Sequence, residues 1–67
     1  MIKCNLSILM GRDKKTIQDV CNETGMARNT VANLYKEKAT RIDYATIERL
    51  CKMFHCTVGE LLEYKND

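Results

Sequence analysis

Proline is absent from the 67 residues of this chain, and glycine occurs only three times. An all-β domain of this size needs more turn-forming residues, so helices joined by short connections are favoured. No apolar run approaches the ~18–20 residues that span a bilayer. Asn5, Ser7 and Arg12 interrupt the apolar N-terminal stretch, so no signal-peptide pattern is present. We therefore expect a cytoplasmic protein with no membrane partner.

The C-x-x-C spacing typical of zinc and redox sites is also missing, although the chain has four cysteines. Thiols in the cytosol stay reduced, and cysteine behaves as a small hydrophobe. We expect all four to fill the core and no metal to be bound. A thiol or metal sensor that uses Cys51 and Cys56 remains an alternative. His55, which lies between them, is expected at the surface or at a helix end.

Catalytic motifs are missing as well. The sequence contains no nucleophile–base pair, no glycine-rich phosphate loop and no paired carboxylates. We therefore expect a protein that is not an enzyme, without a cofactor or an evident small-molecule ligand. Hydrophobic residues make up 45% of the chain, enough to form a core. At 7.7 kDa, residues 1–67 are expected to form one domain.

Charge is divided unevenly along the chain. Residues 1–41 carry eight basic and four acidic side chains, a net charge of +4, whereas residues 42–67 carry three basic and five acidic side chains, a net charge of −2. A basic half and an acidic half indicate one face for a polyanion and another turned away from it.

Five short helices are predicted from apolar residues at helical spacing and from capping signals. Their expected first residues or caps are Asn5, Thr16, Ala27, Asp43 and Thr57. The first three are expected to end near Asp13, Gly25 and Tyr35, and the last to include Leu61 and Leu62. Thr16 with Asp19 and Thr57 with Glu60 have the spacing of capping boxes. The aromatic residues expected in the core are Tyr35, Tyr44 and Phe54.

Residues 16–35 have the pattern of a helix-turn-helix: a capped helix, a turn at Gly25, and a second helix over 27–35. Val20 and Cys21 on the first helix are expected to meet Val31 and Leu34 on the second, with Met26 filling the elbow between them. The outer face of the second helix is then free to enter a major groove.

The sequence TIQDVCNETGMARNTVANL, residues 16–34, resembles the helix-turn-helix of the Xre/Cro-type phage-repressor family, and IERLCKMFHCTVGELL, residues 47–62, resembles the last two helices of that family. The resemblance implies an all-α, compact five-helix bundle of the lambda-repressor-like type. It also implies binding to operator DNA, usually as a dimer, with repression or activation of transcription.

Two positions depart from the family pattern. Ile17 occupies the first helical position, where the family often has a phosphate-contacting glutamine, so we expect Ile17 to pack inward and Gln18 or the Thr16 hydroxyl to meet the backbone. Ala27 occupies a capping position that is commonly serine or threonine. Because alanine cannot cap, we expect this helix to lose about 1 kcal/mol locally.

The resemblance and the chemistry of the side chains together name candidate contacts to double-stranded DNA. The base-reading candidates are Arg28, Asn29, Ala32 and Asn33. The phosphate-binding candidates are Thr16, Gln18, Thr30, Lys36, Lys38 and Arg41. The candidate contacts in a homodimer are Leu61, Leu62 and Tyr64.

We therefore expect a transcriptional regulator, a repressor in the first instance, that inserts the helix over residues 27–35 into the major groove. The alternative is a protein-interaction module, antitoxin-like or adaptor-like, that keeps the same fold but meets a protein with its outer face.

Overall fold

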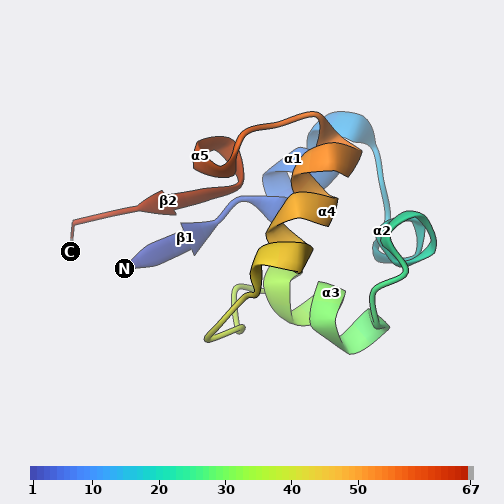
Figure 1. The fold of residues 1–67 in the computed structure, drawn as a ribbon, viewed down its shortest axis with the longest axis horizontal. Coiled ribbons are helices and arrows are strands. Elements are labelled where there is room, and N and C mark those ends of the chain that lie inside the picture. The colour runs from blue at the N-terminus through green and yellow to red at the C-terminus, as the bar shows by residue number, and fades with distance from the viewer. Residues whose placement is uncertain (67) are drawn as a thin grey trace.

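The fold, described for residues 1–66 in a computed structural model, consists of five helices and a small two-stranded sheet in that range (Figure 1). The elements in order are β1 (Ile2–Cys4), α1 (Leu6–Asp13), α2 (Ile17–Thr24), α3 (Arg28–Tyr35), α4 (Tyr44–Phe54), α5 (Val58–Leu61) and β2 (Leu62–Tyr64). None of the helices within this part of the chain is long and apolar enough to cross a membrane.

The expectation of an all-α fold is corrected by the sheet. β1 and β2 pair antiparallel with Ile2 opposite Tyr64 and Cys4 opposite Leu62, so the two ends of the chain lie side by side. Leu62, expected in the last helix, is the first residue of β2, because α5 ends at Leu61. Three-residue strands are too short to give a recognisable alternating pattern, and this pairing joins residues about 60 positions apart.

The prediction that Asn5 caps the first helix is also corrected. It lies at the N-cap position of α1, but its side chain makes no capping bond within the described residues. The Nδ2 group instead donates to the backbone oxygen of Glu60 at 3.2 Å and to Oε1 of Glu63 at 3.0 Å. The Asn5 amide donates to the Leu61 oxygen at 2.7 Å. Asn5 therefore ties the start of α1 to the end of α5 and to β2.

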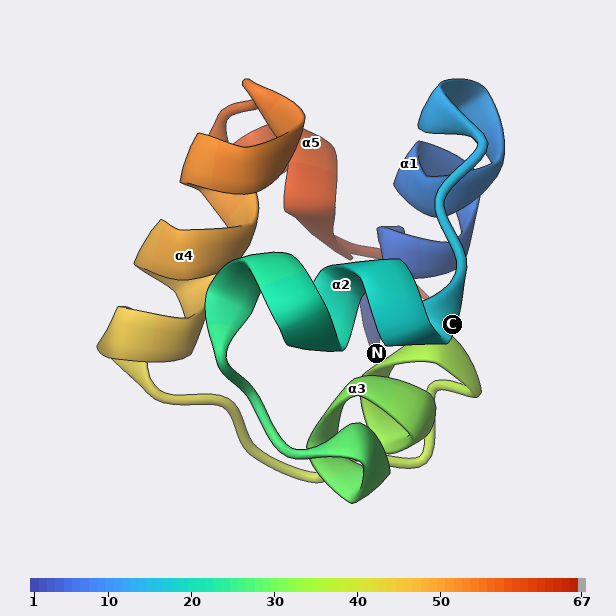
Figure 2. The same cartoon turned by 90° about the vertical axis from the view of Figure 1, so that its right-hand side faces the viewer.

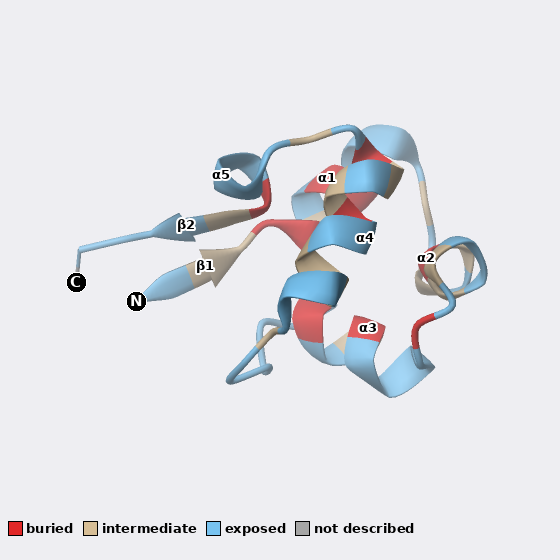
Figure 3. Ribbon diagram, in the orientation of Figure 1, coloured by how far each residue is buried: buried red, intermediate tan, exposed pale blue. Residues whose placement is uncertain are grey.

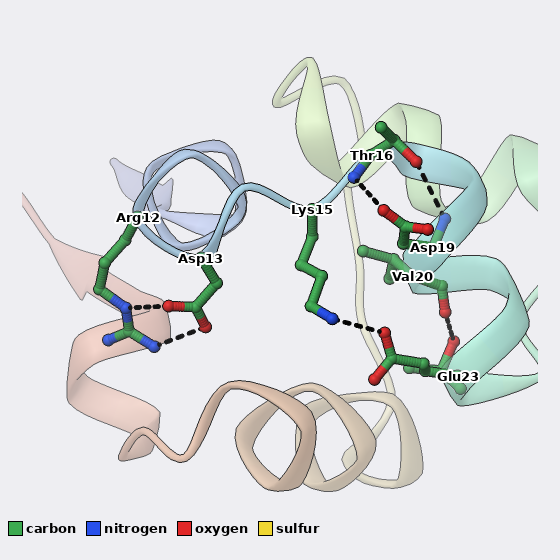
Figure 4. A network of polar contacts seen from close by, with 8 residues as sticks. Arg12, Asp13, Lys15, Thr16, Asp19, Val20 and Glu23 are labelled. Carbon is green, nitrogen blue, oxygen red and sulfur yellow. Dashed lines mark hydrogen bonds and ion pairs between the residues drawn. The ribbon is translucent and has the colours of Figure 1, made fainter.

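The other capping predictions are confirmed. Thr16 and Asp19 form the expected capping box around the start of α2, as do Thr57 and Glu60 around α5. Asp43 accepts a bond from the Thr46 amide at 2.8 Å and caps α4. Figure 4 shows the Thr16–Asp19 box beside the connection from α1 to α2, and an ion pair of 3.1 Å joins Lys15 in this connection to Glu23 on α2.

The core lies where all five helices meet (Figure 3). Its buried members are Leu6, Leu9, Met10, Val20, Met26, Val31, Leu34, Leu50, Phe54 and Leu61. Two aromatic predictions are wrong: Tyr35 is 42% exposed and Tyr44 is 90% exposed. Tyr35 follows Leu34 at the last position of α3, and Tyr44 is the first residue of α4, six residues before Leu50, the first buried residue of that helix.

All four cysteines are free thiols that are partly buried at the edge of the core, so they only partly fill it as expected. Burial raises the pKa of the Cys4 thiol, and the nearby carboxylate of Glu37 adds to this effect. His55 is exposed and ends α4 in a left-handed conformation with φ of 51°, which agrees with its expected place at a helix end.

Candidate nucleic-acid interface

The turn between α2 and α3 fixes how α3 projects from the molecule. Gly25 takes the left-handed conformation, with φ of 75°, and its amide donates to the Cys21 oxygen at 2.9 Å. The Thr24 hydroxyl donates to the Val20 oxygen at 2.6 Å and accepts from the Met26 amide at 3.2 Å. Met26 is buried in the elbow as predicted. This rigid turn holds α3 across α2 at the lower edge of the fold (Figure 2).

The face of α3 opposite the core is open and carries no acidic side chain. Val31 and Leu34 are buried, whereas Arg28, Asn29 and Asn33 are exposed. Ala32, the remaining base-reading candidate, is partly buried beside them. The four candidates therefore occupy one side of a single helix, and a partner can reach the polar atoms of the three exposed ones.

Arg28 is held in place by α2. Its Nη1 donates to Oε1 of Gln18 at 2.7 Å, and Nε2 of Gln18 donates to Oδ1 of Asn22 at 2.9 Å. Ile17 packs against the core as expected, which leaves Gln18 on the outer side. The contact between Gln18 and Arg28 was not predicted, because it joins two helices and has no local spacing rule.

The first turn of α3 has no side-chain cap among residues 1–66, which confirms the prediction made from Ala27. The amide groups at this end are therefore not satisfied by a capping side chain. They lie next to Arg28 and Asn29, and the positive end of the helix dipole adds to the charge of Arg28.

A hollow of about 510 Å³ lies beside α3, and we call it the α3–α4 hollow. It is formed by α3, the connector over residues 36–43 and the first turn of α4. Four of the predicted DNA contacts line it, namely Thr30, Asn33, Lys38 and Arg41. Thr40 on the connector and Thr46 on α4 also line it and are not among the predicted contacts.

Two carboxylates lie near this surface, and both accept hydrogen bonds from other residues of the chain. Asp43 lines the α3–α4 hollow, where hydrogen bonds from the side chain and backbone of Thr46 lower the pKa of its carboxyl group. Glu37, in a left-handed conformation with φ of 57°, accepts from the Cys4 amide at 3.2 Å. Glu37 is thus bound to β1, a contact between distant residues that no local spacing rule indicates.

The remaining phosphate candidates are exposed but lie apart from the hollow. Thr16 and Gln18 are at the start of α2, and the Thr16 oxygen already accepts from the Asp19 amide at 3.1 Å. Lys36 follows the last residue of α3. The candidates thus form two groups, one at the start of α2 and one that extends from Thr30 on α3 along the connector.

Comparison with known proteins identifies the fold. Residues 5–67 match the family of the Cro/C1-type HTH DNA-binding domain. The chain belongs to this family. A relative in Bacillus subtilis (strain 168), the uncharacterized HTH-type transcriptional regulator YozG, is 27% identical over 63 residues, which cover 94% of this chain and 75% of the relative. The resemblance to Xre/Cro-type regulators is therefore confirmed at the level of the family.

The three residues of this Cro/C1-type domain that are expected to contact a second copy differ in their exposure. Leu61 is completely buried within the chain, so its side chain is not exposed to a second copy. Leu62 is partly buried, and Tyr64 on β2 is 72% exposed. Only Leu62 and Tyr64 have side-chain surface available for such a contact.

Proposed function

We propose that this protein binds double-stranded DNA in a sequence-specific manner and regulates transcription, with α3 as the recognition helix in the major groove. The observation that supports this proposal most directly is the open, acid-free face of α3, with Arg28, Asn29 and Asn33 exposed on it. An α-helix fits the width of the major groove of B-DNA, and the base edges there differ for every base pair.

Base reading is assigned to four side chains of α3. Arg28 is suited to a bidentate contact with O6 and N7 of guanine, and Gln18 orients its guanidinium. Asn29 and Asn33 are suited to N6 and N7 of adenine, and Ala32 to the methyl group of thymine.

Phosphate binding is assigned to two groups of residues, one at the start of α2 and one that extends from α3 along the connector. Thr16 and Gln18 would meet one phosphate at the start of α2. Thr30, Lys36, Lys38 and Arg41 would meet the backbone on the other side, three of them from the α3–α4 hollow. Contacts of this kind fix the register of a protein on the duplex and supply most of the salt-dependent affinity.

A homodimer is part of the proposal, because one recognition helix covers only a few base pairs. Two copies would read half-sites about 34–36 Å apart on a pseudo-palindrome. Leu62 and Tyr64 are the proposed contacts between copies. We further propose that residues 1–67 act as one domain and that the effect on transcription is repression, by occupation of the site.

Selection of bound duplexes from a random DNA pool tests these assignments together. We expect enrichment of a sequence with two inverted half-sites at the stated spacing. Enrichment of one isolated half-site would contradict the proposed dimer but would still support binding to DNA. If no sequence is enriched and the affinity for duplex DNA lacks a steep dependence on salt, the proposal is wrong and a protein partner for α3 becomes the better explanation.

A further inference from the structure

Cys51 and Cys56 occupy two related positions at the end of α4. His55 adopts the left-handed conformation, and the Cys56 amide donates to the Cys51 oxygen at 3.1 Å. This is the backbone bond of a Schellman motif, in which the side chains of these two positions commonly touch. The bond also limits the distance between the two Cα atoms to at most about 7 Å by covalent geometry.

The two side chains meet on an accessible surface. Both line a shallow hollow between α4 and the start of α5, together with Lys52 and Val58, and both are partly exposed. Desolvation raises the pKa of the Cys56 thiol, and the adjacent Cys51 thiol, which lies within hydrogen-bonding reach, raises it further. Disulfides join Cα atoms about 4.4–6.8 Å apart, a range compatible with this pair.

A metal is a poorer fit to this pair. In the part of the chain that the structure describes, no cluster of three or more His, Cys, Asp or Glu side chains is placed to hold an ion. Zinc in proteins takes four ligands in structural sites and three protein ligands in catalytic ones. Two thiols held close together without further ligands favour covalent chemistry between the sulfur atoms themselves.

We propose that Cys51 and Cys56 form a thiol pair that is reversibly oxidised to an intramolecular disulfide by exchange with a low-molecular-weight disulfide. The Cys51 thiolate attacks one sulfur of the reagent and releases one thiolate. Cys56 then gives its proton to solvent, and its sulfur attacks Sγ of Cys51, releasing the second reagent thiolate. Two protein thiols are oxidised, one reagent disulfide is reduced to two thiols, and the new bond joins the end of α4 to the start of α5.

A matched pair of variants isolates this chemistry. The variant Cys4→Ser/Cys21→Ser keeps only the proposed pair, whereas Cys51→Ser/Cys56→Ser keeps only the other two cysteines. Each is equilibrated in a buffer of reduced and oxidised glutathione, and its mass and alkylatable thiols are measured. We expect the first variant to lose both thiols and the mass of two hydrogen atoms as a monomer, and the second to form no intramolecular disulfide.

Closeness in sequence alone would also allow some disulfide to form, so the experiment is repeated in concentrated guanidinium chloride. If the fold brings the thiols together, the ratio of oxidised to reduced protein is at least about tenfold higher in the native state. By linkage, oxidation then raises the urea midpoint of the wild-type chain. An equal or lower ratio in the native state, only mixed disulfides with glutathione, or only cross-linked dimers would each overturn the proposal.

Discussion

In the proposed complex with DNA, Arg28 is the side chain whose chemistry most restricts which base pair α3 can read. We expect Arg28→Ala to weaken binding to the preferred duplex by about 1–3 kcal/mol and to relax the preference at one base pair. Gln18→Ala keeps the base-reading side chain but removes the group that orients it and a proposed phosphate contact, and we expect a smaller loss of about 0.5–1.5 kcal/mol. Competition between the preferred duplex and single-base variants measures both effects. The control is Arg49→Ala, which removes an exposed positive charge from α4.

Lys38 belongs to the same surface but acts in a different way. A lysine that meets phosphate neutralises charge without reading bases, so Lys38→Ala should weaken all duplexes to a similar extent. The slope of log affinity against log salt should fall by about one. Titrations at several salt concentrations on preferred and random duplexes test this. An unchanged salt dependence in this variant would show that Lys38 does not contact a phosphate.

At the scale of elements, the turn before α3 depends on one backbone conformation. A methyl group added at Gly25 meets nothing within 4 Å, so only the left-handed backbone, with φ of 75°, opposes alanine there. We expect Gly25→Ala to lower the free energy of unfolding by about 1–2 kcal/mol. Gly11→Ala is the matched control, because Gly11 lies within α1 and also has open space around it. It should raise stability by about 0.5–1 kcal/mol, and urea denaturation compares the two variants.

The capping box of α2 makes stability depend on pH. The Thr16 amide donates to the Asp19 carboxylate at 2.9 Å and lowers the pKa of this group below its ordinary value of 3.8. A group whose pKa is lowered by folding stabilises the folded state at a pH above its ordinary pKa. This contribution is lost as the pH falls through the pKa of the group in the folded state. We therefore expect Asp19→Asn to reduce the fall in the urea midpoint between pH 5 and pH 2.

The control for this prediction is Glu48→Gln, which removes an exposed carboxylate from α4 without removing a cap. Its urea midpoint should fall with acidification as in the wild type. An identical fall in Asp19→Asn and the wild type would show that the capping box does not contribute to the pH dependence.

The elements that could be predicted from sequence are those specified by neighbouring residues. A local backbone requirement is satisfied by Thr16 with Asp19, by Gly25, and by Thr57 with Glu60. The predictions made from these residues are all confirmed. The open face of α3 followed from helical spacing. In contrast, the exposure of Tyr35 and Tyr44 depends on where neighbouring elements end, which spacing within one helix does not reveal.

At the scale of the whole molecule, the parts missed by sequence analysis are contacts between distant segments. The sheet, the bond from Asn5 to Glu60, and the bond from Cys4 to Glu37 join residues 33 or more positions apart. Each involves backbone atoms, which carry no sequence signature. The candidate site was affected in the same way, since the bond between Gln18 and Arg28 joins two helices.

The stability of the whole molecule is expected to depend on Asn5. Its side chain is almost completely buried and joins α1 to both α5 and β2. We expect Asn5→Ala to lower the free energy of unfolding by about 1–3 kcal/mol. Asn5→Asp should cost more, because it places a carboxylate beside Glu63. Asn22→Ala, at an exposed site on α2, should change stability by less than about 0.5 kcal/mol. Equal effects of Asn5→Ala and Asn22→Ala in urea denaturation would rule out this role.

The pairing of Met1 with Lys65 has a practical consequence for engineering. The Met1 amino group donates to the Lys65 oxygen at 2.7 Å, and the Lys65 amide donates to the Met1 oxygen at 2.8 Å. The strands β1 and β2 lie at the end of the long axis that is remote from α2 (Figure 1). A fluorescent protein attached beyond this strand pair therefore starts away from α2, and the pairing of Met1 with Lys65 favours a short peptide linker for closing the backbone into a ring or permuting it.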